Sequence, residues 1–305
     1  MNITFTDRRP LVTNAMVSKA INEVSYFANP MITIMEDHKA RIFFNSRTKR
    51  NFSIIQSIDI DLRDFSLELS SFQTQIGAKK LSGFCSHGLS LGGTYLEDGQ
   101  YFVSTMGWIN KPPEHWYGTI GKIRMDDEFN LVPQSLTEWF TLDSEDSISL
   151  SYPAIYERDG TSRMWYGSTL TWDAGNGEML HILKEKVSTD SINFVKTGRI
   201  LNYDLNTAQA FSRPSILEIN GRALMAYSYR GGNSHYRIGF VWLDDLTTAS
   251  HLGGLASFLP SGKSGEAKMV EYPFLFIHNS KIYMLYNGDD FGKTGIGVVT
   301  LQFEH

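Results

Sequence analysis

The chain has very little cysteine: Cys85 is the single one among 305 residues. It can therefore form no internal disulfide bond. No apolar run approaches the roughly eighteen residues of a membrane span, and the opening residues lack the apolar core of a secretory signal. From these absences we expect a cytoplasmic protein. The net charge of −5 arises from interspersed acidic and basic residues, so neither a nucleic acid nor an anionic membrane is an expected partner.

Metal-binding and cofactor motifs are also missing. His87 has no second histidine or cysteine at the spacing of metal ligands. No nucleophile elbow, metalloprotease helix or dinucleotide fingerprint occurs in the chain. The sequence therefore predicts neither a metal ion nor a cofactor, and any chemistry has to come from ordinary side chains.

A proline that returns at a fixed interval is the most regular feature present. Pro153, Pro214 and Pro273 lie about 60 residues apart, each at the start of an apolar run. Pro30 lies about two such intervals before Pro153, and the stretch around Ser90 fills the copy that lacks a proline. The spacing indicates five repeats.

Each repeat contains a second apolar segment rich in aromatic and β-branched residues, as expected for a strand. These segments are residues 41–45, 101–105, 163–167, 224–228 and 283–287. Turn sequences such as Asn220-Gly221 separate the two strands of a repeat. Repeats of mostly four short strands that close radially form a propeller. We therefore predict an all-β, five-bladed β-propeller that occupies residues 1–305 as one domain.

The first 25 residues stand outside this pattern. Apolar residues fall near helical spacing between Leu11 and Val24, with Thr13 or Asn14 as a cap. The same segment could instead be an irregular lead-in that completes the last blade, and the sequence leaves both interpretations open.

In a propeller the innermost strands run along a central channel, and their heads converge on an axial pocket. The polar residues at these positions are Asn29, His87, Ser151, Tyr152, Ser212, Arg213, Glu271 and Tyr272. Glu271 lies within an apolar strand, where a carboxylate is costly unless it is paired or used. Arg213 either ties two blades together or binds an anionic or polyhydroxy ligand. His87 suits acid–base chemistry better than metal binding.

The ends of the second strands supply another set of candidates. They comprise Trp108, Trp172, Tyr229, Arg230 and Asn287. Aromatic faces beside hydrogen-bonding side chains suit sugar rings. Aromatic residues at blade interfaces would have the same sequence signature. Lys268 and Glu266 precede the last inner strand and belong either to the site or to a solvated loop.

Three segments resemble a group of glycosidase-like five-bladed propeller proteins of bacterial surface-polysaccharide gene clusters. They are Arg-Met-Trp-Tyr-Gly-Ser at 163–168; Ser-Arg-Pro at 212–214 with Tyr-Ser-Tyr-Arg at 227–230 and Tyr-Arg-Ile-Gly-Phe at 236–240; and Met-Val-Glu-Tyr-Pro-Phe at 269–274 with the closing stretch 283–298. The group is distantly similar to arabinanase, xylosidase and invertase propellers. Arabinanase-like enzymes carry an acidic residue where this chain has Asn29, and the nearer group usually carries a glutamate at the position of Lys268.

The resemblance implies an axial pocket that binds a sugar, an oligosaccharide or a nucleotide sugar. The first hypothesis is an enzyme that hydrolyses or transfers a glycosyl group in surface-glycan metabolism, with Glu271 and His87 as catalytic residues. Substrate-binding residues would be Asn29, Ser151, Tyr152, Trp172, Arg213, Tyr229, Arg230, Lys268 and Asn287. The alternatives are a sugar-binding propeller that has lost the glycosidase carboxylates and a protein-interaction scaffold. The oligomeric state is open.

Overall fold

The computed structural model describes residues 2–17, 25–246 and 256–304, which are built almost entirely of β-strands. The predicted all-β class is confirmed. The two short α-helices are α1 (Asn14–Val17) and α2 (Asp289–Gly292), and four single-turn helices, η1 to η4, are Ala78–Lys80, Gly83–Cys85, Pro133–Ser135 and Leu243–Asp245. Within the described ranges, no helix is long and apolar enough to cross a membrane.

The described strands pair into five antiparallel groups of four. The first group comprises β2 (Ser25–Ile34), β3 (Lys39–Arg47), β4 (Ser53–Asp61) and β5 (Ser66–Ile76). The second comprises β6 (Gly88–Glu97), β7 (Gln100–Ile109), β8 (Tyr117–Arg124) and β9 (Thr137–Phe140). The third comprises β10 (Ser149–Arg158), β11 (Thr161–Thr171), β12 (Leu180–Ser188) and β13 (Val195–Ile200). The fourth comprises β14 (Ala210–Ile219), β15 (Arg222–Arg230), β16 (Arg237–Trp242) and β17 (Ser257–Phe258). The last comprises β18 (Glu271–His278), β19 (Lys281–Asn287), β20 (Ile296–Glu304) and β1 (Asn2–Val12).

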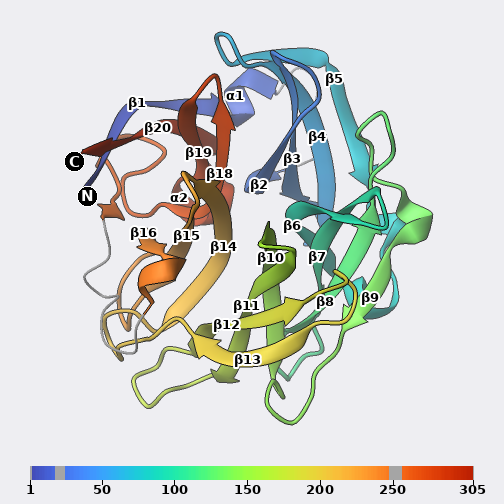
Figure 1. Ribbon diagram of the computed structural model, residues 1–305, viewed down its shortest axis with the longest axis vertical. Coiled ribbons are helices and arrows are strands. Elements are labelled where there is room, and N and C mark those ends of the chain that lie inside the picture. The colour runs from blue at the N-terminus through green and yellow to red at the C-terminus, as the bar shows by residue number, and fades with distance from the viewer. Residues whose placement is uncertain (1, 18–24, 247–255, 305) are drawn as a thin grey trace.

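The first strand of each group lies near the centre of the molecule in Figure 1. Around this centre β2 contacts β6, β6 contacts β10, β10 contacts β14, β14 contacts β18, and β18 contacts β2. Two parallel bridges, between β4 and β6 and between β12 and β14, link neighbouring groups further. The predicted second segments lie in β3, β7, β11, β15 and β19, as the repeat indicated.

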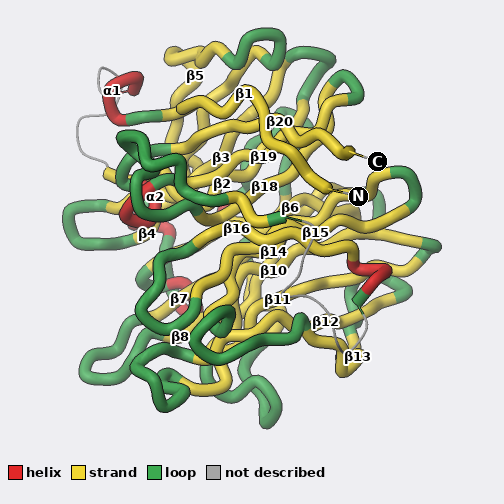
Figure 2. The backbone as a smooth tube through the Cα atoms, turned by 90° about the vertical axis from the view of Figure 1, so that its left-hand side faces the viewer, coloured by secondary structure: helices red, strands yellow, loops and turns green. Residues whose placement is uncertain are grey.

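The N-terminal segment completes the last group. β1 pairs antiparallel with β20, so the two ends of the chain lie side by side, as Figure 2 also shows. The helix considered between Leu11 and Val24 is wrong for Leu11 and Val12, which lie in β1, and α1 spans only four residues. Residues 18–24 lie outside the described part. Residues 11 and 12 form a strand rather than a helix because pairing with β20 satisfies the backbone N–H and C=O groups of an otherwise open strand edge.

A β-bulge interrupts every inner strand at the same position. The register breaks there between each inner strand and its partner. The residue before each repeated proline has a positive φ between 40° and 53°, which is uncommon for a residue with a side chain. These residues are Asn29, Tyr152, Arg213 and Tyr272. In β6 the register breaks at Gly92-Gly93, and a side chain on Gly92 would collide with the carbonyl of Pro153.

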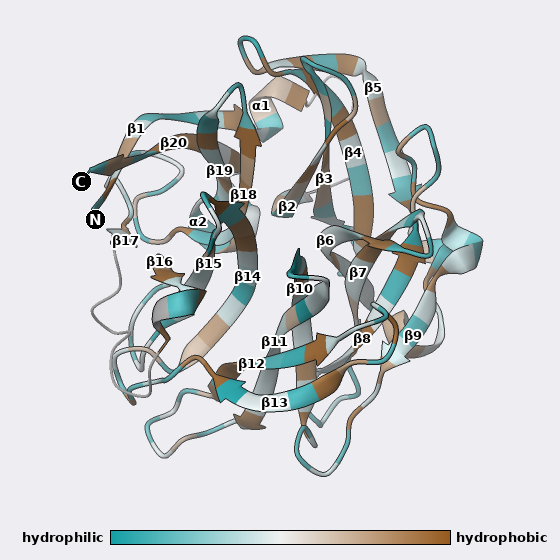
Figure 3. Ribbon diagram, in the orientation of Figure 1, coloured by the Kyte–Doolittle hydropathy of each residue, from teal (hydrophilic) through white to brown (hydrophobic). Residues whose placement is uncertain are grey.

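Apolar residues recur along the central strands, and Figure 3 shows them in brown. One cluster joins the first and last groups and includes Phe27, Phe44, Leu285 and Val298. Since each side chain in this cluster is nearly or fully buried, the seam between the groups is a continuous hydrophobic core rather than a loose contact.

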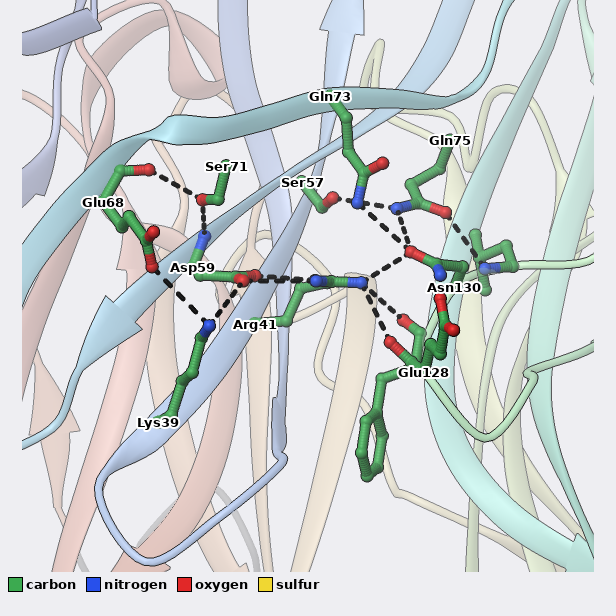
Figure 4. A network of polar contacts seen from close by, with 12 residues as sticks. Lys39, Arg41, Ser57, Asp59, Glu68, Ser71, Gln73, Gln75, Glu128 and Asn130 are labelled. Atoms are coloured by element: carbon green, nitrogen blue, oxygen red, sulfur yellow. Dashed lines mark hydrogen bonds and ion pairs between the residues drawn. The ribbon is translucent and has the colours of Figure 1, made fainter.

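A polar network also joins the first group to the second (Figure 4). Arg41 donates from Nε to Asp59 at 2.6 Å and from Nη1 to the Asn130 side chain at 2.6 Å. Asp59 is buried, and Arg41 also bonds the carbonyls of Glu128 and Phe129 in the loop after β8. Because the Arg41 guanidinium has hydrogen-bond partners in both groups, it fixes the orientation of the two groups and thereby that of their inner strands.

Candidate functional site

A cavity of about 510 Å³ opens at the heads of the inner strands. Its wall takes residues from all five inner strands: Asn29 from β2, Ser90 from β6, Tyr152 from β10, Ser212 from β14 and Tyr272 from β18. This size suits a small organic ligand. Because the bulges lie at this level, the cavity is built where the inner strands are most strained, and strain of this kind is typical of functional sites.

Aromatic rings and carboxamides dominate the wall. The aromatic residues are Tyr26, Trp108, Trp116, Tyr152, Phe211, Tyr236, Tyr272 and Phe291, and the carboxamides are Asn29, Asn45, Asn51 and Asn110. Phe291 is 47% exposed and follows Asp290, and both have positive φ values near 56°. A strained pair thus holds an exposed ring at the opening of the cavity.

Two carboxamide oxygens in this wall have no partner. Asn29 Oδ1 and Asn45 Oδ1 are fully enclosed, and neither accepts a hydrogen bond from a described residue. The nitrogen of Asn45 is used, since it donates to Ser53 Oγ at 2.9 Å and to the Leu89 carbonyl. A buried acceptor without a donor costs about 1–3 kcal/mol. The two oxygens are therefore positioned to accept hydrogen bonds from a ligand.

Tyr152 and Tyr272 form a pair across the cavity wall, with ring centroids 5.6 Å apart. Burial raises the pKa of Tyr152. Burial also raises the pKa of Tyr272 well above 10, and the neighbouring Glu271 adds to the effect. Both phenols therefore stay protonated and can donate hydrogen bonds.

The charged residues of the wall are two arginines, Arg47 and Arg230, and the wall contains no aspartate or glutamate. Arg47 lies over the Trp108 ring at 4.9 Å, and Arg230 lies over the Tyr236 ring at 4.7 Å. Arg230 also forms an ion pair with Glu178 at 2.9 Å. Stacking on an aromatic face fixes the plane of a guanidinium and leaves its edge free for hydrogen bonds.

Ser151 and His181 form a buried polar group in the same wall. Ser151 Oγ lies 2.7 Å from His181 Nε2, and Thr169 Oγ1 lies 2.7 Å from His181 Nδ1. Gly167 permits this approach, since a Cβ there would lie 2.2 Å from both Ser151 Oγ and His181 Nε2. Burial lowers the pKa of His181 to about 4, so the imidazole is neutral near pH 7.

His181 should make the fold sensitive to acid. Its pKa is about 4 in the folded protein and about 6.5 in the unfolded chain, so between these values the unfolded chain binds more protons. Stability is therefore retained above pH 6.5 and lost as the pH falls toward 4. Through His181 the wild type should lose about 2–3 kcal/mol of unfolding free energy between pH 7 and 4.5. His181→Gln should not show this part of the loss, which urea unfolding at the two pH values measures. The exposed His235→Gln should leave the loss unchanged, and an unchanged loss in His181→Gln would contradict the assignment.

Glu271 lies at the head of β18, directly before Tyr272, but it is fully buried and is not part of the cavity wall. Neither carboxyl oxygen has a hydrogen-bond partner among the described residues. Burial raises the pKa of Glu271 well above its usual value, and the charge of Arg230 opposes this only in part. The carboxyl group is therefore a neutral acid that lies one layer behind the wall.

Arg213 is also behind the wall, at the level of the bulges. Its guanidinium donates to the carbonyl of Pro30 at 2.8 Å and to the carbonyl of Leu91. Burial lowers its pKa to about 10. A second cavity of about 400 Å³ begins on the far side, lined by the later parts of the inner strands. Arg213 therefore lies between two cavities of the central channel and ties β14 to β2 and β6.

The prediction that Arg213, Glu271, Asn29 and Tyr152 all line one cavity is thus wrong for Arg213 and Glu271. The bulges present carbonyls to the channel, and Arg213 turns toward these acceptors rather than into the cavity. Glu271 precedes the bulged residue of β18 and faces the other way. Ser151 and Arg230 line the cavity as expected.

The remaining predicted residues lie outside the wall. His87 stacks on Phe52 and lies tilted beside Trp108, and Trp172 stacks on His115 and meets Trp116 edge to face. Tyr229 faces Ser257 at 3.0 Å. His87 and Trp172 thus contact the wall rings Trp108 and Trp116 without being part of the wall.

Lys268 and Asn287 have structural contacts instead. Lys268 is exposed, and its backbone N–H donates to Asp289 at 2.8 Å. Asn287 Oδ1 accepts from the backbone N–H of Asn29 at 2.9 Å, and Asn287 Nδ2 donates to the Phe27 carbonyl. Asn287 therefore joins the last group to the first.

Sequence reasoning missed several wall residues, among them Asn45, Arg47, Trp116, His181 and Phe291. Asn45 and Arg47 lie at the end of β3, in the position where Trp108 and Arg230 lie on β7 and β15. The same second-strand rule, applied to the first repeat, would have found them. His181 begins a third strand, and no sequence signal marks it. No cluster of three potential metal ligands occurs within the described ranges.

Solved structures with this fold are glycoside hydrolases and related proteins. A protein titled "Glycoside hydrolase" matches with a TM-score of 0.71 and 10% identity over 100% of this chain and 93% of its own. The β-1,2-mannobiose phosphorylase of Listeria innocua matches with a TM-score of 0.67 and 11% identity over 98% and 96%. An α-L-arabinofuranosidase of Lactobacillus brevis gives 0.65 and 13% over 95% and 94%. The chain therefore has the fold of the glycosidase propellers, as its resemblance implied.

Sequence relatives define the family more narrowly. No protein-family model matches the chain. The Mycobacterium tuberculosis proteins MT1551 (strain CDC 1551 / Oshkosh) and Rv1502 (strain ATCC 25618 / H37Rv), both titled as uncharacterized, are each 30% identical over 282 residues, which covers 91% of this chain and 93% of theirs. The chain belongs to the family of these two mycobacterial proteins.

Proposed function

We propose that this protein is a five-bladed β-propeller, one domain over residues 1–305, whose axial cavity binds a carbohydrate. The five strand groups would be the blades, and β1 would close the ring by pairing with β20. Contacts between successive inner strands around the centre support this arrangement.

The observation that carries the proposal is a pair of enclosed, unpaired acceptors in an aromatic wall. Asn29 Oδ1 and Asn45 Oδ1 lack donors, and sugar hydroxyls would supply them. Phe291, which lines the cavity and is 47% exposed, offers a ring face for the C–H patch of a sugar. A scaffold for protein partners would have no use for buried acceptors of this kind, because leaving them unpaired costs stability.

A glycan screen followed by titration calorimetry tests the proposal. We expect a sugar to bind, and we expect Phe291→Ala to weaken its binding on the order of tenfold, because the exposed stacking face is lost. Tyr203→Ala removes an aromatic residue that is 40% exposed outside the cavity, and it should leave the affinity unchanged. A sugar that binds both variants equally well would bind elsewhere, and failure of every glycan to bind would end the proposal.

The second candidate function is an enzyme that acts on a glycosidic bond, favoured by the neutral buried acid of Glu271. Conventional hydrolysis needs two carboxyl groups about 5–5.5 Å or 6.5–9.5 Å apart. The cavity wall has no carboxyl group. A reaction that needs only one acid therefore fits better, such as transfer of a glycosyl group to an acceptor that is itself an anion. The phosphorylase among the proteins of this fold supports that form of the reaction. Neither His87 nor Glu271 is part of the cavity wall, and Glu271 would carry the chemistry because burial raises the pKa of its carboxyl group.

The biological setting stays a prediction. A role in bacterial surface-glycan metabolism follows from the resemblance of residues 269–274 and 283–298, and the cytoplasmic location follows from the sequence. A nucleotide sugar would fit both, because such donors are used in glycan assembly inside the cell.

A further inference from the structure

We propose that the ligand of the axial cavity carries an oxyanion, a phosphate or a carboxylate, and that Arg47 binds it. This inference rests on the proposed carbohydrate function, because it names the chemistry of the sugar. The site lies at one side of the cavity, where the ends of β3 and β7 meet and Arg47, Asn51, Trp108 and Asn110 form the wall.

The charge of the cavity is the first argument. Two arginines and no carboxylate line it, so the charged groups of the wall itself are all positive. A concave site lined by charge of one sign raises the local concentration of ions of the opposite sign. The two arginines are not equivalent, however: Arg230 is paired with Glu178 at 2.9 Å, whereas no described carboxylate lies within ion-pair distance of Arg47.

The surrounding chain adds to this asymmetry. From Lys39 to Ile58 the sequence contains five basic residues and no aspartate or glutamate. One of these, Arg50, lies in the exposed turn that follows Arg47. The turn therefore extends the positive charge from the cavity wall to its rim, where it would attract an anion.

The geometry of Arg47 is the second argument. Its guanidinium lies over the Trp108 ring with Cζ 4.9 Å from the centroid, and Nη1 donates to the Asn51 carbonyl at 3.3 Å. These contacts fix the guanidinium plane and leave most of its N–H groups unused. A planar fork held in this way matches the two oxygens of a phosphate or carboxylate.

Tyr152 brings a second donor to the same point. The charge of Arg47 acts on the Tyr152 hydroxyl, which lowers the pKa of that phenol, although burial raises it more. Both residues line the cavity. The unpaired Asn29 and Asn45 oxygens remain for the neutral hydroxyls of the same ligand.

The test is a titration with inorganic phosphate at constant ionic strength, followed by the indole N–H resonance of Trp108, with chloride as the comparison salt. We expect a saturable shift in the wild type that is at least tenfold weaker in Arg47→Gln, because the charged fork is lost. Arg50→Gln removes a neighbouring exposed charge and should retain the wild-type midpoint. Arg47→Lys keeps the charge without the two-pronged guanidinium, and its titration midpoint should lie between those of the wild type and Arg47→Gln.

Absence of a saturable shift in the wild type at tens of millimolar phosphate would overturn the inference, as would equal midpoints in wild type and Arg47→Gln. Parallel titrations use glucose 1-phosphate, glucuronate and glucose. Tighter binding of the first supports a phosphate, and tighter binding of the second supports a carboxylate, in each case with loss in Arg47→Gln. Glucose binding that Arg47→Gln leaves unchanged would preserve the proposed function and refute the oxyanion. Phosphate binding at Arg47, with no sugar found in the glycan screen, would support the oxyanion site and refute the proposed carbohydrate function.

Discussion

Glu271→Gln is expected to lower turnover of a glycosyl substrate on the order of 10²–10⁴-fold and to leave substrate affinity within about twofold. Gln keeps the shape of the side chain but cannot supply a proton. Glu271 does not form part of the wall, so the affinity should not depend on it directly. Steady-state rates and calorimetry on the same variant measure both quantities.

A substrate-free measurement accompanies this prediction. The pKa of Glu271 is raised in the fold, so the folded protein binds more protons than the unfolded chain above about pH 4.5. The stability linked to Glu271 is complete below that pH and is lost as the pH rises toward the folded pKa, by about 1.4 kcal/mol for each unit of pKa difference. Glu271→Gln should therefore raise Tm at pH 8 relative to the wild type, with a smaller difference at pH 4.5.

Glu218→Gln is the matched control, since Glu218 is exposed on the inner strand β14. It should change neither turnover nor the pH dependence of Tm. Wild-type turnover in Glu271→Gln would remove Glu271 from the chemistry and leave sugar binding as the function of the cavity.

Arg213→Ala is expected to destabilise the fold by about 3–5 kcal/mol, as is typical when a buried charged group is deleted and its partners are left unpaired. The carbonyls of Pro30 and Leu91 lose their donors, and a void opens between the two cavities of the channel. Chemical unfolding measures the loss. Because Arg213 is not in the wall, ligand affinity measured below the unfolding transition should change little.

Two further variants separate the causes. Arg213→Met fills the volume without the charge and should lose less stability than Arg213→Ala. Arg63→Ala removes an exposed arginine that pairs only at the surface with Asp61, and it should change stability by less than about 0.5 kcal/mol. A loss of stability in Arg213→Ala no larger than in Arg63→Ala would show that the bridge across the channel contributes nothing.

The sequence predicted the strand pattern because each repeat combines a proline, a turn and an aromatic segment, and all three have local physical causes. The proline marks a bulge that the chain needs at that point, as Asn29 and Tyr152 show by their positive φ values. The role of β1 was not decidable from the sequence. Its partner β20 lies at the other end of the chain, so only the closed arrangement selects strand over helix.

The candidate site was predicted in part. Asn29, Ser151, Tyr152 and Arg230 line the cavity, because strand heads and strand ends converge there. Arg213 does not, although it shares the register of Tyr152. At the bulge a side chain follows its hydrogen-bond partners, and local sequence does not reveal the free carbonyls of two other strands.

The most direct test of the account is a crystal structure of the protein with the sugar found by the glycan screen. The account predicts the sugar in the axial cavity, with Asn29 Oδ1 and Asn45 Oδ1 accepting hydrogen bonds from its hydroxyls and a ring of the sugar on Phe291. A sugar bound in the second cavity beyond Arg213 or on the outer surface, with these two oxygens still unpaired, would contradict it.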